Sequence, residues 1–206
     1  PIAPLVEALK IVGADIEYLE NTGFPPIKIK GKRLTKNKVE VDGSISSQYI
    51  SALLMIAPVL ENGLKINIKG KLVSKLYAEM TAALMKHFGI IVSWKENTIE
   101  ILHQNYIPKS YKVESDWSAA AFWYSVAALS KDAEITLNGL HKNSLQGDAV
   151  LPELMKQFGV ETEFLKDGII IKKTKPFDYA QSDITIDFTN FPDLAQSLTV
   201  AAAALD

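Results

Sequence analysis

The chain of 206 residues contains no cysteine. Disulfides, thiolate metal sites and cysteine nucleophiles are therefore excluded within it, as is typical of a reducing compartment such as the cytoplasm. No apolar run approaches the roughly 20 residues that a membrane-spanning helix needs, and nothing resembles a signal peptide. The formal net charge of −2 lacks the positive field of a nucleic-acid or membrane-surface binder. We therefore expect a soluble, cytoplasmic, globular protein without nucleic-acid or membrane partners.

Familiar metal and nucleotide motifs are also missing. His87, His103 and His141 show no metal-ligand spacing. Neither the Gly-x-Gly-x-x-Gly pattern nor the Gly-x-x-x-x-Gly-Lys-Ser/Thr pattern occurs. The sequence thus predicts no metal and no cofactor.

The two ends of the sequence favour a piece of a longer protein. Pro1 leads straight into an amphipathic helical pattern, and the apolar stretch 194–205 stops without a Gly, Pro or basic cap. The alternative is a complete chain whose terminal helix docks onto its own core.

An internal repeat is visible in what the sequence does contain. An amphipathic helix, a Gly and an alternating strand recur at Gly13, Gly89 and Gly159, 70 to 76 residues apart. Each Gly is expected to close its helix in the left-handed conformation. Almost uncharged helices interleave with this pattern at 46–60, at 116–129 and, in a truncated third copy, from Asp193. Lacking charge over three turns, these helices are expected to be buried nearly all round.

The pattern predicts an α/β layered fold. Its unit is strand, buried helix, strand, amphipathic helix, strand, strand, with two complete copies whose mixed sheets pack around the buried helices. A repeat this long is a supersecondary unit and not a solenoid rung. A domain boundary is expected near 111–114, after the loop 103–110, which gives domains 1–113 and 114–206.

Serines stand where two of the helices begin. Ser46 and Ser47 follow a strand, and Ser74, Lys75 and Tyr77 open the next amphipathic helix. Backbone N–H groups at a helix start, two hydroxyls and the positive end of the dipole suit a phosphate or carboxylate. The alternative is ordinary serine N-capping beside a solvated lysine.

Acidic residues begin the other uncharged helices. Asp193 could be a general base with a shifted pKa or simply a helix cap. Asp116 holds the comparable place one copy earlier, which favours capping for both. The run Gln146-Gly-Asp148 is expected to be a structural turn and cap.

Taken together, these motifs resemble the EPSP synthase family of 3-phosphoshikimate 1-carboxyvinyltransferases. The resemblance covers essentially the whole chain, in family order and spacing. It is carried by these runs: Tyr18-Leu-Glu, Pro25-Pro-Ile-Lys-Ile, Asp42-Gly-Ser-Ile-Ser-Ser-Gln-Tyr, Leu72-Val-Ser-Lys-Leu-Tyr, Asn143-Ser-Leu-Gln-Gly-Asp and Asn190-Phe-Pro-Asp. It departs from the family at Trp117, where the usual Glu-Gly-Asp-Ala-Ser-Ser run has Ala.

The resemblance implies a fold and a reaction. The fold is an inside-out α/β barrel of repeated βαβαββ units in two lobes, here truncated at both ends and divided as 1–113 and 114–206. The reaction, in the shikimate pathway, joins the 5-hydroxyl of shikimate 3-phosphate to C2 of phosphoenolpyruvate through a tetrahedral intermediate that loses phosphate. The whole protein is expected to be a monomer.

The resemblance also assigns roles to single residues. The 3-phosphate is assigned to Ser46, Ser47 and Ser74. Gln48 and Tyr77 are assigned to the shikimate ring, Gln48 also reaching phosphoenolpyruvate. Asp193 is assigned to the ring hydroxyls and to the 5-hydroxyl proton.

The cations that neutralise phosphoenolpyruvate and the acidic proton donor lie, in the family, outside this chain. Electrostatic stabilisation is usually the largest catalytic term, so this chain alone is predicted to have no turnover. Truncation would also expose apolar surface and favour self-association. Two alternatives stay open: an enolpyruvyl transferase acting on UDP-N-acetylglucosamine, and a non-enzymatic α/β repeat that binds a partner through its exposed sheet faces.

Overall fold

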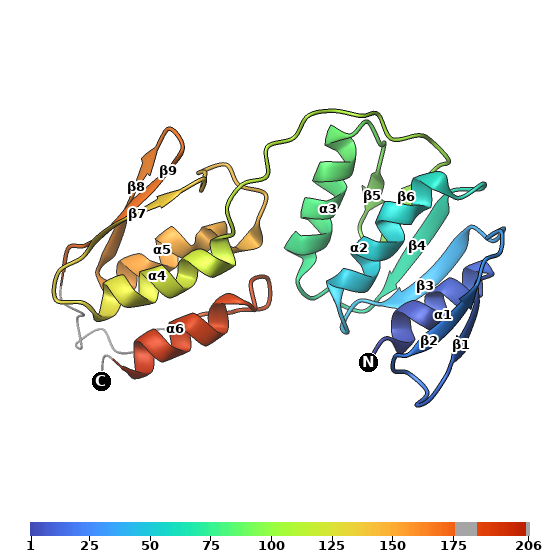
Figure 1. The fold of residues 1–206 in the computed structure, drawn as a ribbon, viewed down its shortest axis with the longest axis horizontal. Coiled ribbons are helices and arrows are strands. Elements are labelled where there is room, and N and C mark those ends of the chain that lie inside the picture. The colour runs from blue at the N-terminus through green and yellow to red at the C-terminus, as the bar shows by residue number, and fades with distance from the viewer. Residues whose placement is uncertain (176–184, 205–206) are drawn as a thin grey trace. The chain divides into compact units, whose positions relative to one another are not determined.

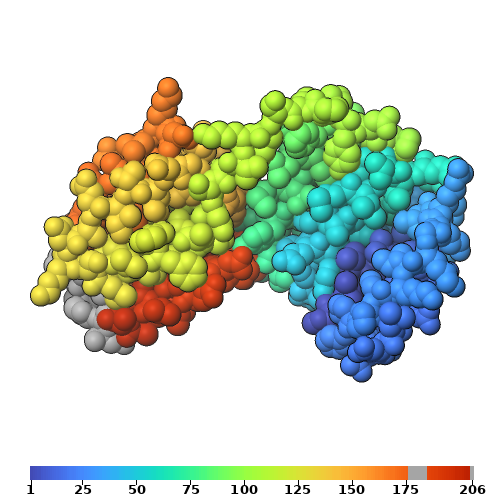
Figure 2. Space-filling model, in the orientation of Figure 1, coloured from blue at the N-terminus to red at the C-terminus, as the bar shows by residue number. Residues whose placement is uncertain are grey.

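The computed structural model describes residues 1–175 and 185–204, which divide into two compact units, Pro1–Ser110 and Tyr111–Asp206. The segment 102–116 between the last strand of one unit and the first helix of the other has no helix or strand, and it runs along the surface (Figures 1 and 2). No helix in the described part of the chain is long and apolar enough to cross a membrane.

The first unit opens with helix α1 (Ala3–Val12), which has a proline in its first turn. Such a proline costs no hydrogen bond, because the first N–H groups of a helix have no intrahelical acceptor. Gly13 ends the helix with φ 114°, in the left-handed region that disfavours side chains. An antiparallel pair follows, β1 (Asp15–Tyr18) with β2 (Ile27–Lys30).

A four-stranded sheet in the order β3-β4-β6-β5 forms the centre of this unit. Its members are β3 (Lys38–Asp42), β4 (Leu64–Lys69), β5 (Ser93–Lys95) and β6 (Thr98–Ile101). β3 runs parallel to β4, whereas β6 is antiparallel to both of its neighbours. Helix α2 (Ser47–Ile56), continued by the short 3-10 helix η1 (Ala57–Val59), and helix α3 (Lys75–His87) pack against this sheet (Figure 1).

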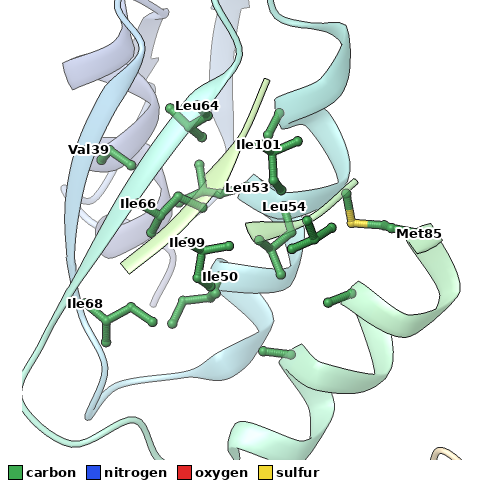
Figure 3. Close-up of a cluster of buried hydrophobic side chains, with 14 of the residues drawn as sticks. Val39, Ile50, Leu53, Leu54, Leu64, Ile66, Ile68, Met85, Ile99 and Ile101 are labelled. Carbon is green, nitrogen blue, oxygen red and sulfur yellow. The ribbon is translucent and has the colours of Figure 1, made fainter. Parts of the chain in front are cut away.

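The core of the first unit lies between the sheet and these helices (Figure 3). Alternation along β4 turns every second residue inward, so that Leu64, Ile66 and Ile68 are buried while Lys65 and Asn67 between them are only half-buried. Other large members of this core, labelled in Figure 3, are Val39, Ile50, Leu53, Leu54, Met85, Ile99 and Ile101.

The second unit contains a three-stranded antiparallel sheet in the order β7-β9-β8. Its strands are β7 (Glu134–Asn138), β8 (Val160–Leu165) and β9 (Gly168–Lys173). Its helices are α4 (Trp117–Leu129), the 3-10 helix η2 (Gly147–Val150), α5 (Leu151–Met155), the 3-10 helix η3 (Lys156–Phe158) and α6 (Leu194–Ala203). The core gathers the inward side chains of these elements, among them Trp117, Tyr124, Phe158, Ile169, Ile171 and Leu198.

The predicted repeat is confirmed in its topology. The first unit contains one whole copy, β3-α2-β4-α3-β5-β6, and the sheet order β7-β9-β8 of the second unit matches β4-β6-β5 of the first. The three expected glycines all have positive φ. The expectation of two complete copies is wrong, because the described residues before α4 form no strand.

The expectation that α4 is buried all round is also wrong. Its Ala-rich face packs inward, and its hydroxyl at Ser125 donates to the Ser197 carbonyl oxygen of α6 at 3.1 Å. The opposite face leaves about half of each large side chain exposed, at Phe122, Trp123, Val126 and Leu129. These four residues form the α4 stripe. An uncharged helix is therefore half-covered in this unit.

Trp117 is fully buried and lies 6.4 Å from Phe164, measured between ring centroids. Its indole N–H has no hydrogen-bond partner in the described part of the chain. Nothing in the structure explains why tryptophan stands at this position.

Candidate functional site

The carboxyl ends of β3 and β4 bring two helix N-termini to one edge of the first unit. Because the two strands are parallel neighbours, with Asp42 opposite Lys69 in register, the loops that follow them leave the same edge of the sheet. The first loop leads into α2 and the second into α3. Ligands of open α/β sheets bind outside the carboxyl ends of parallel strands, and helix N-termini there favour anions.

Ser46 and Ser47 begin α2. Ser46 is extended, and its hydroxyl accepts a hydrogen bond from the Gln48 backbone N–H at 3.3 Å, so the capping interpretation is confirmed for this residue. Ser47 is 5% exposed, although serine is usually found at the surface. The side chain of Gln48 is exposed at the same helix start.

Ser74 stands at the start of α3 in an unusual conformation. Its φ of 53° and ψ of 38° place it in the left-handed region, and its hydroxyl does not cap the helix. A non-glycine residue in this region costs on the order of 1 kcal/mol and clusters at functional sites. The capping interpretation is therefore wrong for Ser74. The hydroxyl of Ser74 lies at the N-terminus of α3 but makes no capping hydrogen bond to this helix.

Tyr77 and Lys75 complete this helix start. The Tyr77 backbone N–H donates to the Ser74 carbonyl oxygen at 3.1 Å, and a residue three positions on shares a helix face with Ser74. Lys75 is not simply solvated, as the capping alternative supposed. Its ammonium pairs with Glu79 at 2.8 Å and lies 5.6 Å from the ring centroid of Trp94.

An aspartate turn shapes the loop before Ser46, and the sequence analysis missed it. Asp42 Oδ1 accepts from the Ser44 backbone N–H at 2.8 Å and from the Ser44 hydroxyl at 2.7 Å. These bonds from Ser44, with a smaller contribution from the Lys69 charge, hold the pKa of Asp42 below its usual value. The signal was present, because Asp-Gly-Ser is typical turn chemistry.

Asp193 belongs to the second unit. It occupies the N-cap position of α6, exposed to solvent, with helical φ and ψ, and its side chain does not cap the helix. Asp116 does cap α4, by accepting from the Ser118 backbone N–H at 2.9 Å. The shared capping role expected for the two aspartates is therefore wrong for Asp193.

The run at Gln146 is structural, as expected. The Gln146 side chain accepts from the Trp117 backbone N–H and donates to the Ser115 carbonyl oxygen, both at 2.8 Å. Asp148 is buried and accepts a hydrogen bond from the Ser118 hydroxyl. This network fixes the start of α4 against η2. In the described part of the chain, no group of three or more His, Asp or Glu residues could hold a metal ion.

Comparison with known proteins gives this geometry a family. The family model described as EPSP synthase (3-phosphoshikimate 1-carboxyvinyltransferase) matches residues 1–206. The chain belongs to the EPSP synthase family. Among its EPSP synthase relatives, the 3-phosphoshikimate 1-carboxyvinyltransferase of Bacteroides fragilis is 46% identical over 207 residues, covering 100% of this chain and 50% of the relative. That of Vibrio campbellii is 39% identical, covering 100% of this chain and 47% of the relative.

Solved structures share the EPSP synthase fold with this chain. EPSP synthase from Acinetobacter baumannii matches with a TM-score of 0.67 at 20% identity, over 98% of this chain and 46% of that one. The enolpyruvyl transferase NikO from Streptomyces tendae matches with a TM-score of 0.57 at 15% identity, over 82% of this chain and 41% of that one. The predicted enolpyruvyl transferase type of fold is thus confirmed. The chain spans half or slightly less of the length of these relatives.

Proposed function

We propose that the whole protein, of which this chain supplies about half, transfers the enolpyruvyl group of phosphoenolpyruvate to the 5-hydroxyl of shikimate 3-phosphate and releases phosphate. The observation that carries the proposal is that Ser46 and Ser47 open α2 and Ser74 opens α3, the two helices that follow the parallel strands β3 and β4 at one sheet edge. The relatives' name, 3-phosphoshikimate 1-carboxyvinyltransferase, supports it over a UDP-N-acetylglucosamine enolpyruvyl transferase or a non-enzymatic module.

The three serines receive the 3-phosphate of the substrate. A phosphate dianion at this edge accepts from hydroxyls and from those N–H groups of the first helical turns that have no acceptor within the helix. The two helix dipoles add partial positive charge. This assignment explains why Ser74 is held in a strained conformation although its hydroxyl does not cap α3: the hydroxyl binds the phosphate.

The ring of the substrate lies beyond the phosphate. Gln48, exposed at the start of α2, and Tyr77, on the Ser74 face of α3, contact the ring in this proposal, with Gln48 also reaching phosphoenolpyruvate. Asp193 holds the ring hydroxyls and accepts the 5-hydroxyl proton as that oxygen bonds to C2 of phosphoenolpyruvate. Residues 1–113 then form part of the shikimate 3-phosphate lobe, and residues 114–206 begin the second lobe.

The proposal extends to the state of the protein. The whole enzyme works as a monomer in the cytoplasm on small-molecule substrates, without nucleic-acid or membrane partners. The present chain alone has no turnover, because two anionic substrates would meet without the cations that the rest of the enzyme supplies. It self-associates through apolar surface such as the α4 stripe.

A titration tests the phosphate site directly. Calorimetry of the chain with shikimate 3-phosphate is expected to show binding that shikimate lacks and that a Ser46→Ala, Ser47→Ala double variant loses. Ser93→Ala is the matched control, because Ser93 is exposed on the edge strand β5 of the same unit. Equal binding of both ligands, unchanged binding by the double variant, or no binding of the phosphate ester by either this chain or the whole enzyme would contradict the proposal.

Ser74→Gly separates binding from folding. Glycine removes the hydroxyl and also relieves the left-handed strain, so the free energy of unfolding should stay the same or rise by up to about 1 kcal/mol. The affinity for shikimate 3-phosphate should fall nevertheless. A merely structural serine would change both quantities in the same direction, which denaturant unfolding and calorimetry on one preparation would reveal.

A further inference from the structure

Gly43 is the residue at which the two site loops are joined. Its backbone N–H donates to the Lys69 carbonyl oxygen at 3.0 Å, and its carbonyl oxygen accepts from the Val73 N–H at 3.0 Å. Lys69 ends β4, and Val73 directly precedes Ser74. A single residue of the loop after β3 therefore holds both ends of the loop after β4.

There is no room for a side chain at this junction. A Cβ on Gly43 would lie 2.7 Å from Cγ2 of Ile68, 3.1 Å from Cα of Leu72 and 3.2 Å from the Leu72 nitrogen. The Ile68 methyl group is bonded to the β-carbon of a buried, β-branched side chain, and the Leu72 contacts are with backbone, so relief requires the loop 70–74 to move. The φ of Gly43 lies outside the left-handed region, so space and not backbone freedom requires glycine here.

We infer that Gly43 is a positioning residue for phosphate binding. It touches no ligand itself. It sets the separation between the Ser46–Ser47 hydroxyls, which follow it on its own loop, and the Ser74 hydroxyl, which follows Val73 on the other. Three hydroxyls can meet one phosphate group only at a fixed spacing, and displacements well below 1 Å weaken such contacts. This inference rests on the proposed function, because it needs the three serines to share one ligand.

The substitution Gly43→Ala tests it against Gly31→Ala. Gly31 lies in the same unit, and a Cβ there would meet no atom within 4 Å. Calorimetry with shikimate 3-phosphate is expected to give a dissociation constant about tenfold higher for Gly43→Ala and unchanged for Gly31→Ala. The stoichiometry should stay the same. A folding defect would have a different effect: it would lower the fraction of chains that can bind and leave the dissociation constant of the remaining chains unchanged.

A second pair of variants decides through which residue Gly43 acts. In a Ser74→Gly chain, adding Gly43→Ala should weaken binding by much less than tenfold, because the hydroxyl that it misplaces is already absent. The variant Gly43→Ala, Ile68→Ala removes the side-chain overlap and keeps the Leu72 backbone contact. Compared with Ile68→Ala alone, which has the same loss of core packing, it should still bind weakly.

The outcomes separate the two claims. If neither this chain nor the whole enzyme binds shikimate 3-phosphate, the proposed function fails, and this inference fails with it. If the unaltered chain binds and Gly43→Ala binds equally well, the inference alone is overturned. It is likewise overturned if adding Ile68→Ala to Gly43→Ala restores the affinity for shikimate 3-phosphate. The same holds if the effects of Gly43→Ala and Ser74→Gly on the binding free energy simply add.

Discussion

The hydroxyl oxygen of Thr81 on α3 lies 3.0 Å from the hydroxyl oxygen of Ser51 on α2. It also lies 3.0 Å from the Tyr77 carbonyl oxygen, which can only accept a hydrogen bond. The Thr81 proton therefore points to Tyr77, and Ser51 donates to Thr81. This chain of bonds joins the two helices just behind the N-termini that carry Ser46 and Ser74.

Thr81→Val is expected to lower the free energy of unfolding by about 1 kcal/mol. Valine keeps the shape of threonine but removes the hydroxyl that links Ser51 to Tyr77, in a half-buried place where the loss of a hydrogen bond is destabilising. Urea unfolding measures the effect, with Thr199→Val on the exposed face of α6 as control. A cycle with Ser51→Ala should show coupling, and strict additivity would count against the link.

The site was predictable in its parts and not in its geometry. Two serine-bearing helix starts can be recognised from residue types and spacing alone, because capping and anion binding use the same residues. The sequence could not show whether a serine hydroxyl caps its own helix or is left for a ligand. That distinction depends on backbone conformation, which is extended at Ser46 and left-handed at Ser74. The role of Gly43 needed the neighbouring loop, because its space is closed by Ile68 and Leu72, which lie far from it in sequence.

The fold was predictable where local pattern decides it. Glycine after an amphipathic helix and alternation along β4 follow from short-range chemistry, and both were confirmed. Burial of α4 depends instead on what lies around the helix. Its composition predicted burial on all sides, yet Phe122 and Val126 on the α4 stripe are about half exposed. Composition shows which side chains of a helix are apolar, but the elements packed around the helix determine which of them are buried.

The ionised carboxylate of Asp42 stabilises the first unit, and this contribution is lost at low pH. Its pKa is lowered in the folded state by the two hydrogen bonds from Ser44, so the unfolded chain binds the proton more tightly. This contribution is complete above the ordinary value of 3.8 and is lost as the pH falls through the lower folded pKa. Asp42→Asn should therefore be less stable than the unaltered chain at pH 7, with a difference that shrinks in acid. Asp15→Asn, exposed on β1, is the control in the same pH series.

The α4 stripe predicts self-association of this chain. Phe122 and Val126 lie four residues apart on one helix face, and each exposes half or more of its surface. Replacing both by Gln should remove concentration dependence from the sedimentation coefficient without lowering the stability, since neither side chain belongs to the core. Ile29→Gln, which removes one exposed apolar residue from β2 of the first unit, should leave the association intact. If the stripe variant still associates, another surface is responsible.

Lys173 joins the ends of two helices in the second unit. Its ammonium donates to the Ala128 carbonyl oxygen at 2.8 Å and to the Phe158 carbonyl oxygen at 2.9 Å, at the ends of α4 and η3. Helix C-termini carry partial negative charge and carbonyls without intrahelical partners, so one cation satisfies both. Lys173→Met should lower the free energy of unfolding by about 2 kcal/mol, because it leaves the carbonyls of two buried residues without their charged donor. Lys166→Met, in the exposed turn between β8 and β9, should have little effect.

The stability difference between the unaltered chain and Lys173→Met also depends on pH, in a direction that the pKa of Lys173 predicts. Burial lowers the pKa of Lys173 from its ordinary 10.5, so in alkali the folded chain loses this proton before the unfolded chain does. Between the folded pKa and 10.5 the unfolded state binds more protons, and the contribution of Lys173 to stability rises with pH. The stability gap between the unaltered chain and Lys173→Met should therefore widen as the pH rises from the folded pKa to 10.5. A gap that narrows over this interval would mean that the bonds to Ala128 and Phe158 favour the charged form more than burial opposes it.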